Sequence, residues 1–173
     1  AAAQRPILGI CGGYQMLGDS IDDPVESRRG TVQGLGLLPL HTTFGPEKTL
    51  SRPSRNLVDG SRIEGYEIHH GAVERSGGEP FFADEGCRVG AVTGTSWHGL
   101  FENDRFRRGF LMECAAQAGR SFTVSPSCCF ADFREARFER LADMVAEHLD
   151  TEALQQIIEG RIDKHRPVHI SSA

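Results

Sequence analysis

The sequence has no surplus of positive charge, because 19 lysine and arginine residues are outnumbered by 24 aspartate and glutamate residues. The formal net charge is −5, and no stripe of basic residues of the kind that grips phosphate backbones is present, so we expect no nucleic-acid partner. No apolar run reaches the ~18 residues of a membrane-spanning helix. The alanine-rich start also lacks the basic-then-apolar order of a signal peptide. We therefore expect neither membrane nor nucleic acid as a partner.

The cysteines do not form the pattern of a disulfide framework or of a structural zinc site. There are five, an odd number, and none stands in a Cys-x-x-Cys pair. We expect reduced thiols, no metal and a cytoplasmic protein. The sequence also lacks the Gly-x-x-x-x-Gly-Lys-Ser/Thr phosphate loop, so it does not by itself indicate a nucleotide-binding module. With 173 residues, of which 39% are hydrophobic, the chain can bury one core.

A short apolar run followed by a glycine-rich bend stands almost at the start of the chain. Residues 7–10 predict a buried strand, and the glycines at positions 9, 12 and 13 predict a sharp turn into a helix, with Cys11 at the bend. This is the strand-turn-helix elbow of a nucleophile, with sulfur in place of a serine oxygen. Amide N–H groups at the helix start favour a thiolate there. The alternative interpretation is a structural core cysteine.

Periodicity and turn residues predict the remaining elements. We expect a surface loop over residues 19–29, a strand over 40–44 that ends at Gly45-Pro46, a strand within 48–58, and a strand over 63–73 after a turn at Asp59-Gly60. We expect helices over residues 105–118 and 133–149, and a shorter one from Thr151 onward, with Asp104 and Thr151 as caps of the first and the third. Residues 164–173 are expected to form a disordered tail.

Three histidines are candidates for the site. His69 and His70 are neighbours on an expected strand, so their side chains point to opposite faces and only one can face a given site. A structural role for the pair is as plausible as a functional one. His98 follows an expected strand on a bend flanked by glycine, and a cysteine nucleophile needs an imidazole within hydrogen-bond reach. We therefore choose His98 as the candidate base.

Several motifs, in the right order, resemble one family. They are residues 9–18 (GICGGYQMLG), 34–39 (GLGLLP), 65–69 (GYEIH) and 98–104 (HGLFEND), with weaker similarity over residues 133–135 and 140–143. Together they closely resemble the glutamine amidotransferase domain of the cobyric acid synthases. The resemblance implies an α/β fold of the class I glutamine amidotransferase type, flavodoxin-like, with a mixed sheet flanked by helices. An elbow strand is normally central in such a sheet, yet here it comes first, so we expect residues 1–163 to be an N-terminally truncated domain.

The resemblance implies roles for five residues. Cys11 matches the nucleophile and His98 its base. Gln15 matches a position that helps to hold glutamine, Gly12 is expected to supply one oxyanion N–H group, and His69 is expected to border the pocket. Many class I relatives place a glutamate two residues after the histidine, but Leu100 stands there, so we expect a Cys-His dyad with Glu102 as a weak candidate for orienting the ring.

The resemblance also implies the reaction and its partners. Glutamine is hydrolysed, and the ammonia passes to a synthase domain that uses ATP and Mg²⁺ to amidate carboxylates of a corrinoid, adenosylcobyrinic acid a,c-diamide. That synthase domain and a second oxyanion donor are expected to lie outside this sequence. Three alternatives stay open: the related cobyrinic acid a,c-diamide synthase, a non-catalytic fragment that only binds a synthase domain, and a cysteine hydrolase acting on another amide.

Overall fold

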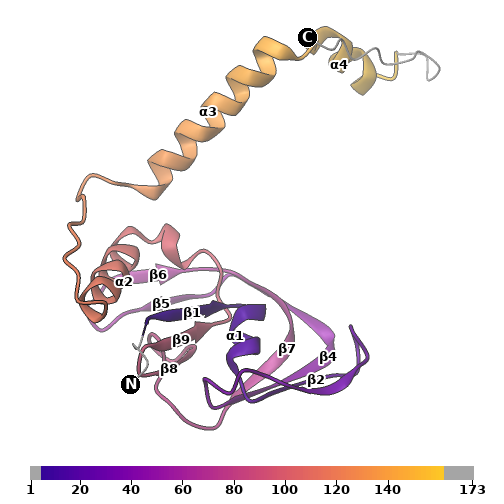
Figure 1. Ribbon diagram of the computed structural model, residues 1–173. Helices are drawn as coiled ribbons and strands as arrows, with labels where there is room; N and C mark the ends of the chain where they lie inside the picture. Colours follow the sequence, from indigo (N-terminus) through magenta and orange to yellow (C-terminus); the bar gives the residue numbers. More distant parts are fainter. Residues whose placement is uncertain (1–4, 162–173) are drawn as a thin grey trace. The chain divides into compact units, whose positions relative to one another are not determined.

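The computed structural model describes residues 5–161, which form two compact units that divide between Cys128 and Cys129 (Figure 1). Each unit is considered by itself. The expected disordered tail, residues 164–173, lies outside the described residues. The first unit carries all of the sheets and the expected site, and the second consists of helices.

One sheet of the first unit contains the expected elbow strand. β1 (Ile7–Ile10) pairs in parallel with β9 (Val92–Thr95), and β8 (Cys87–Val89) pairs antiparallel with β9, giving the order β1-β9-β8. α1 (Gly12–Leu17) follows β1 directly and packs against β1 and β9 (Figure 1). The predicted strand-turn-helix is therefore confirmed, and β1 stands at the edge of the described sheet.

A second, four-stranded sheet has the order β3-β2-β4-β7. Its strands are β2 (Ser20–Asp23), β3 (Gly30–Gln33), β4 (Leu40–Ser51) and β7 (Glu67–Arg75). β2 runs parallel to β4, and the other two pairs are antiparallel. The fold is thus mixed α/β with separate sheets, not one continuous sheet.

Two predictions for residues of this sheet, one of a loop and one of a strand end, were wrong. The expected loop over residues 19–29 contains β2, because Ile21 pairs with Val32 on one side and Thr42 on the other. β4 does not end at Gly45-Pro46 but continues to Ser51, because a register shift against β7 absorbs these residues. Proline donates no ladder hydrogen bond, and such a bulge is where a strand accommodates it.

A two-stranded hairpin joins the second sheet to the bend at His98. β5 (Ser54–Asn56) and β6 (Arg62–Glu64) are antiparallel, and the predicted turn at Asp59-Gly60 connects them, with the Gly60 N–H donating to the Leu57 carbonyl at 2.9 Å. The strand expected over residues 63–73 is interrupted at Gly65 and resumes as β7. A Cβ atom at Gly65 would lie 2.7 Å from the His98 carbonyl oxygen, so glycine is required for this close approach.

Two hydrophobic clusters flank the elbow and the bend. The first joins α1 to both sheets, and the second lies under the bend and receives Phe106 and Phe110 from α2 (Asp104–Gln117). The buried members are Tyr14, Leu17, Leu38, Leu40 and Cys87 in the first cluster, and Ile63, Phe81, Phe82, Trp97 and Leu100 in the second. Each side of the expected site therefore rests on packed side chains.

The cap of α2 differs from the prediction. Asn103, not Asp104, is the N-cap residue, and its side chain bonds to the backbone of β6 instead of the helix. The Asn103 Oδ1 accepts the Glu64 N–H at 2.9 Å, and its Nδ2 donates to the Glu64 carbonyl at 2.7 Å. Asn103 thus ties the hairpin to the short helical turn η1 (Leu100–Glu102) and α2.

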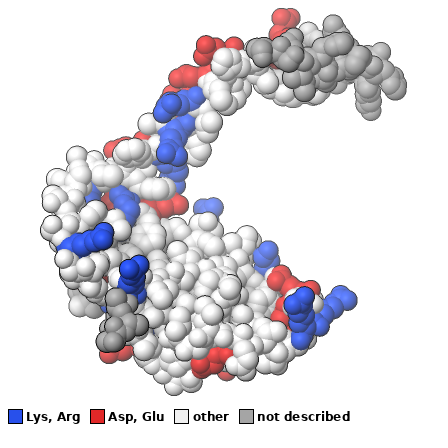
Figure 2. All heavy atoms as spheres, in the orientation of Figure 1, with Lys and Arg blue, Asp and Glu red and all other residues white. Residues whose placement is uncertain are grey.

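The second unit contains α3 (Phe130–His148) and α4 (Thr151–Ile158). The cap of α4 is Asp150, whose Oδ1 accepts the Ala153 N–H at 2.9 Å, so the prediction of Thr151 as cap was wrong by one residue. Within residues 5–161 no helix is both long enough and apolar enough to cross a membrane. On the face of the first unit that Figure 2 shows, acidic and basic side chains stand in small groups at the margin of a broad area without charged side chains.

Candidate functional site

Cys11 occupies a backbone conformation that side-chain-bearing residues rarely adopt. Its φ is 53° and its ψ is −114°, although it is not a glycine. Such a conformation costs on the order of 1–3 kcal/mol and clusters at active sites, where the surrounding structure imposes it. Here the Cys11 N–H donates to the Thr95 carbonyl at 2.9 Å, and the Cys11 carbonyl accepts the Gln15 N–H at 3.1 Å. The bend is therefore fixed by β9 on one side and by α1 on the other.

The glycines around Cys11 serve two different purposes. A Cβ atom at Gly9 would lie 2.6 Å from Leu17 Cδ1 and 2.8 Å from the Gly13 backbone, so α1 packs this closely on β1 only because Gly9 has no side chain. Gly12 and Gly13 face open space, because a Cβ atom at either position would have no neighbour within 4 Å. Gly9 thus permits the elbow, and the other two glycines leave room beside the sulfur for a ligand.

The sulfur and the first helix face β7. The Cys11 Sγ lies 4.0 Å from the Ile68 carbonyl oxygen, and Gln15, which is buried, donates from Nε2 to the His70 carbonyl at 3.0 Å. Gln15 therefore connects α1 to β7 in this structure. Its Oε1 forms no hydrogen bond with the other described residues. That oxygen is the group of Gln15 left for a ligand, and its expected role in holding glutamine stays a prediction.

His98 pairs with the residue that precedes β7. Its backbone N–H donates to the Tyr66 carbonyl at 2.8 Å and its carbonyl accepts the Tyr66 N–H at 3.1 Å. The two rings stack at a centroid distance of 5.0 Å with planes inclined by 12°. The His98 Nε2 is buried and has no hydrogen-bond partner among the described residues. A ring nitrogen in this state is available for proton transfer.

The candidate nucleophile and the candidate base both contact one short stretch of chain, the start of β7 and the residue before it. Cys11 contacts this stretch at Ile68, and His98 contacts it at Tyr66, two positions earlier. Two residues of a strand span roughly 7 Å, so the two side chains approach neighbouring points of one edge. Within residues 5–161 no hydrogen bond joins the Cys11 Sγ to His98. Catalytic hydrogen bonds are often long without substrate, and tighten in the substrate complex.

The two histidines of β7 are held by local contacts. The His69 Nδ1 lies 3.1 Å from the Gly71 carbonyl oxygen, and its Nε2 lies 3.7 Å from Glu67 Oε1. The His70 Nε2 lies 3.7 Å from Glu26 Oε1. These contacts tie His69 to its own strand, so its expected place at the pocket border stays a prediction.

Glu102, the weak candidate for orienting His98, lies beside the same bend. Its Oε1 is 3.7 Å from the position that a Cβ atom would take at Gly99, the residue after His98. The Tyr66 ring is 3.5 Å from that same position. The carboxylate is therefore near the residue that follows the candidate base, and its orienting role stays a prediction.

Three residues that sequence reasoning missed contribute to the site. Tyr66 stacks on His98, Thr95 accepts the Cys11 N–H, and Glu85 bonds to the segment between Thr95 and His98. Tyr66 stands in the motif at residues 65–69, which was a usable signal. Thr95 and Glu85 carry no such signal, because their roles depend on contacts between distant segments.

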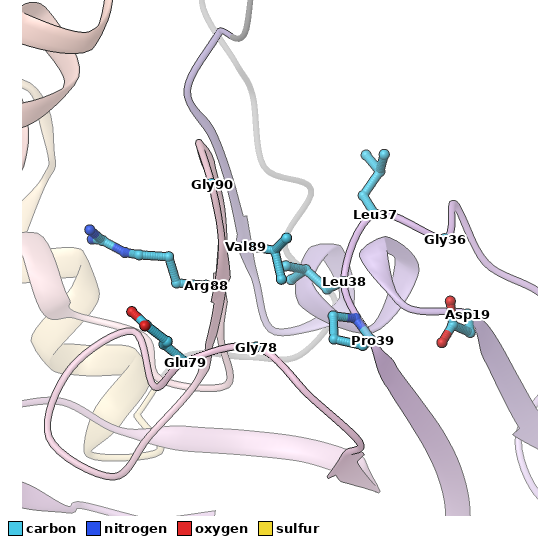
Figure 3. Close-up of a pocket in the computed structure, with 10 residues that line it drawn as sticks. All are labelled: Asp19, Gly36, Leu37, Leu38, Pro39, Gly78, Glu79, Arg88, Val89 and Gly90. Carbon is cyan, nitrogen blue, oxygen red and sulfur yellow. The ribbon is translucent and has the colours of Figure 1, made fainter.

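A surface depression elsewhere in the first unit does not contain the candidate residues (Figure 3). In Figure 3 the Leu37, Leu38 and Val89 side chains line one part of it, and Arg88 and Glu79 lie at its other end. The Arg88 guanidinium is already paired with Glu113. The remaining lining residues are Asp19, Gly36, Pro39, Gly78 and Gly90. The depression offers no nucleophile or unpaired cation for chemistry.

Comparison with known proteins finds a family whose sequence model matches this chain. The family described as the CobB/CobQ-like glutamine amidotransferase domain matches residues 1–106, which include Cys11 and His98. A solved structure titled "Crystal structure of glutamine amidotransferase" is 19% identical with a TM-score of 0.48, over 64% of this chain and 61% of that one.

The chain is also similar to proteins named cobyric acid synthase. It is 57% identical over 160 residues to the cobyric acid synthase of Streptomyces avermitilis. The aligned region covers 92% of this chain and 31% of the relative. It is 55% identical to that of Frankia casuarinae, covering 91% of this chain and 31% of the relative. It is 47% identical to that of Mycolicibacterium smegmatis, and the aligned region covers 96% of this chain and 32% of the relative. The chain thus spans about a third of the length of these curated relatives. Because the family match extends over more than half of its residues, the chain belongs to the CobB/CobQ-like glutamine amidotransferase domain family.

Proposed function

We propose that this chain hydrolyses glutamine and supplies ammonia as the amidotransferase part of a cobyric acid synthase. The observation that carries the proposal is the strained bend at Cys11, whose sulfur faces the same stretch of chain that holds His98. A positive φ at a cysteine between a strand and a helix is the geometry of an exposed nucleophile. Family membership supports glutamine as the substrate.

The proposed reaction is acyl transfer through a thioester. The Cys11 thiolate attacks the side-chain amide carbon of glutamine, forming a C–S bond and an oxyanion. The Gly12 N–H, the first amide of α1 and without an acceptor inside the helix, donates to that oxyanion. His98 gives a proton to the nitrogen as the C–N bond breaks, and ammonia leaves.

The second half of the reaction releases glutamate. His98 takes a proton from water, the hydroxide attacks the thioester carbon, and the C–S bond breaks to regenerate the Cys11 thiolate. Gln15 and His69 are proposed to hold the substrate, with the free Oε1 of Gln15 accepting from the amino group of glutamine.

The acceptor of the ammonia is proposed from the names of the relatives. In a cobyric acid synthase the ammonia amidates carboxylates of adenosylcobyrinic acid a,c-diamide, with ATP and Mg²⁺, in a synthase domain. Within residues 5–161 no group of three or more histidine, cysteine, aspartate or glutamate side chains is placed to hold a metal ion. We propose that ATP and Mg²⁺ bind in that synthase domain. The names of the relatives favour a cobyric acid synthase over a cobyrinic acid a,c-diamide synthase as the whole protein.

The decisive experiment replaces the nucleophile in the full-length protein. Cys11→Ala is expected to abolish glutamine-dependent amidation and glutamate release, while amidation driven by free ammonia continues. Cys128→Ala, which removes an exposed thiol of the same first unit, is the matched control and is expected to change neither activity. Loss of the ammonia-driven reaction in Cys11→Ala, or retained glutamate release, would contradict the proposal.

A labelling experiment separates this proposal from a non-catalytic fragment. A glutamine-directed chloroketone, followed by mass analysis, is expected to modify Cys11 and to be blocked by glutamine. Cys87 is an internal control, because it is fully buried and burial raises the pKa of its thiol. Modification of Cys128 instead of Cys11 would indicate that the chain forms no glutamine pocket.

A further inference from the structure

Thr95 connects the two candidate catalytic residues through its hydrogen bonds. Its carbonyl accepts the Cys11 N–H at 2.9 Å, and its Oγ1 accepts the N–H of Trp97, the residue before His98, at 3.0 Å. Thr95 is completely buried at the end of β9. The backbone of the nucleophile and the approach to the base therefore depend on the position of one residue.

Glu85 fixes that residue from the other side. Its Oε2 accepts the Thr95 hydroxyl at 2.6 Å, and its Oε1 accepts the Ser96 N–H at 2.9 Å. Both carboxylate oxygens are thus used by consecutive residues of the segment that leads to His98. No cation in the described part of the chain forms an ion pair with Glu85. A half-buried carboxylate without a paired cation gains stabilisation from such hydrogen bonds.

The backbone of Glu85 is itself held against the second hydrophobic cluster. Its N–H donates to the Phe82 carbonyl at 2.9 Å, and its carbonyl accepts the Phe81 N–H at 2.9 Å. Phe82 packs edge-on against Trp97, with ring centroids 5.1 Å apart. The turn that carries Glu85 therefore packs, through Phe82, against the Trp97 side chain. The Glu85 carboxylate in turn holds the Trp97 backbone through Thr95.

We propose that Glu85 is a positioning residue of the amidotransferase site, which locks Thr95 and Ser96 so that His98 is held in a fixed relation to Cys11. This inference rests on the proposed function. Glu85 forms no hydrogen bond with the Cys11 or His98 side chain in the described structure and acts through the segment between the two residues. It differs from the orienting carboxylate expected beside the histidine, because it holds the backbone and not the imidazole ring.

The first test is Glu85→Gln in the full-length protein, with Asp84→Asn as the matched control. The amide of the replacing side chain keeps one oxygen for the Ser96 N–H but presents N–H groups to Thr95 Oγ1, which already accepts from Trp97. We expect kcat for glutamate release to fall roughly 10- to 100-fold, with KM for glutamine little changed. Asp84 is adjacent and exposed, and its change is expected to leave kcat unaltered. An unchanged kcat in folded Glu85→Gln overturns the proposal.

The second test does not depend on the folding of that variant. Thr95→Val replaces the hydroxyl group with a methyl group of similar size and is expected to lower kcat as Glu85→Gln does, whereas Thr95→Ser keeps the hydroxyl and is expected to retain most of the activity. Because the two residues act as one unit, the double change Glu85→Gln with Thr95→Val is expected to be no worse than either alone. Additive losses, or equal losses in Thr95→Val and Thr95→Ser, would contradict the coupling.

Amide hydrogen exchange separates failure of this inference from failure of the proposed function. In Glu85→Gln the Ser96 and Trp97 amides are expected to exchange faster, while amides of β4 keep their protection. If the unaltered protein releases no glutamate, the proposed function fails, and the exchange result still tests whether Glu85 holds Thr95 and Ser96. If exchange at Ser96 and Trp97 is unchanged, Glu85 does not hold this segment, whatever the protein hydrolyses.

Discussion

The elbow at Cys11 and the bend at His98 are adjacent but are held in different ways. The elbow is fixed by main-chain hydrogen bonds and by the missing side chain of Gly9, whereas the bend, besides its main-chain pairing with Tyr66, is also held by the side chains of Tyr66, Thr95 and Glu85. Packing of backbone on backbone leaves no room for adjustment, while side-chain contacts can be removed one at a time. The nucleophile should therefore fail together with the fold, and the base should fail separately from it.

The largest expected effect is on the base itself. His98→Ala is expected to lower glutamate release by roughly 10² to 10⁴, the usual contribution of general acid-base catalysis, while ammonia-driven amidation continues. His41→Ala is the control, because His41 bonds to Ser20 in the second sheet, away from the bend. Steady-state kinetics measure the loss. A comparable loss in both variants would show that the effect is structural.

The second effect is on stability and concerns the elbow. Gly9→Ala places a methyl group against Leu17 and the Gly13 backbone, so we expect a loss of about 1–3 kcal/mol in the free energy of unfolding. Gly109→Ala in α2 faces open space and is expected to gain about 0.5–1 kcal/mol. Urea denaturation measures both. If Gly9→Ala unfolds like the unaltered protein, the elbow is not as closely packed as the distances indicate.

The smallest effect concerns the ring that stacks on His98. Tyr66→Ala removes a contact of about 0.5–1.5 kcal/mol, which corresponds to a fall in kcat of about 2- to 10-fold, with unfolding little affected because Tyr66 is 43% exposed. Tyr66→Phe keeps the stacked ring and is expected to retain activity. A fall in kcat with Tyr66→Phe would assign the effect to the hydroxyl group.

The same contrast explains what the sequence reveals of the site. The elbow is readable because a sharp bend requires glycines at fixed spacing around Cys11, and the structure confirms the strand, the turn and the helix. His98 was chosen as the candidate base through the resemblance and its place after a strand, and that role stays a prediction. Glu85 was not found, because an acidic residue in a polar turn has the same pattern whether it faces water or a threonine hydroxyl on another strand.

The elements of the fold also differ in how well the sequence predicts them, because some depend on local pattern and others on pairing with distant strands. α3 was predicted at residues 133–149 and begins only three residues earlier, because helical periodicity is local. β2 was missed because its polar residues give no alternating pattern, and only pairing with β4 and β3 makes it a strand. The passage of β4 through Gly45-Pro46 was missed for the same reason, since the pairing with β7 decides it.

The contacts that Cys11 and His98 make with β7 and the residue before it cross from one sheet to the other. Cys11 and His98 follow the strands β1 and β9, while Tyr66, Ile68 and the His70 carbonyl belong to or precede β7 of the second sheet. Because β1 and β9 are paired with each other, the spacing of Cys11 and His98 is set within the first sheet, and the second sheet contacts both residues from outside it. The stretch from Tyr66 to Ile68 is therefore where a change in the second sheet would reach both candidate residues at once.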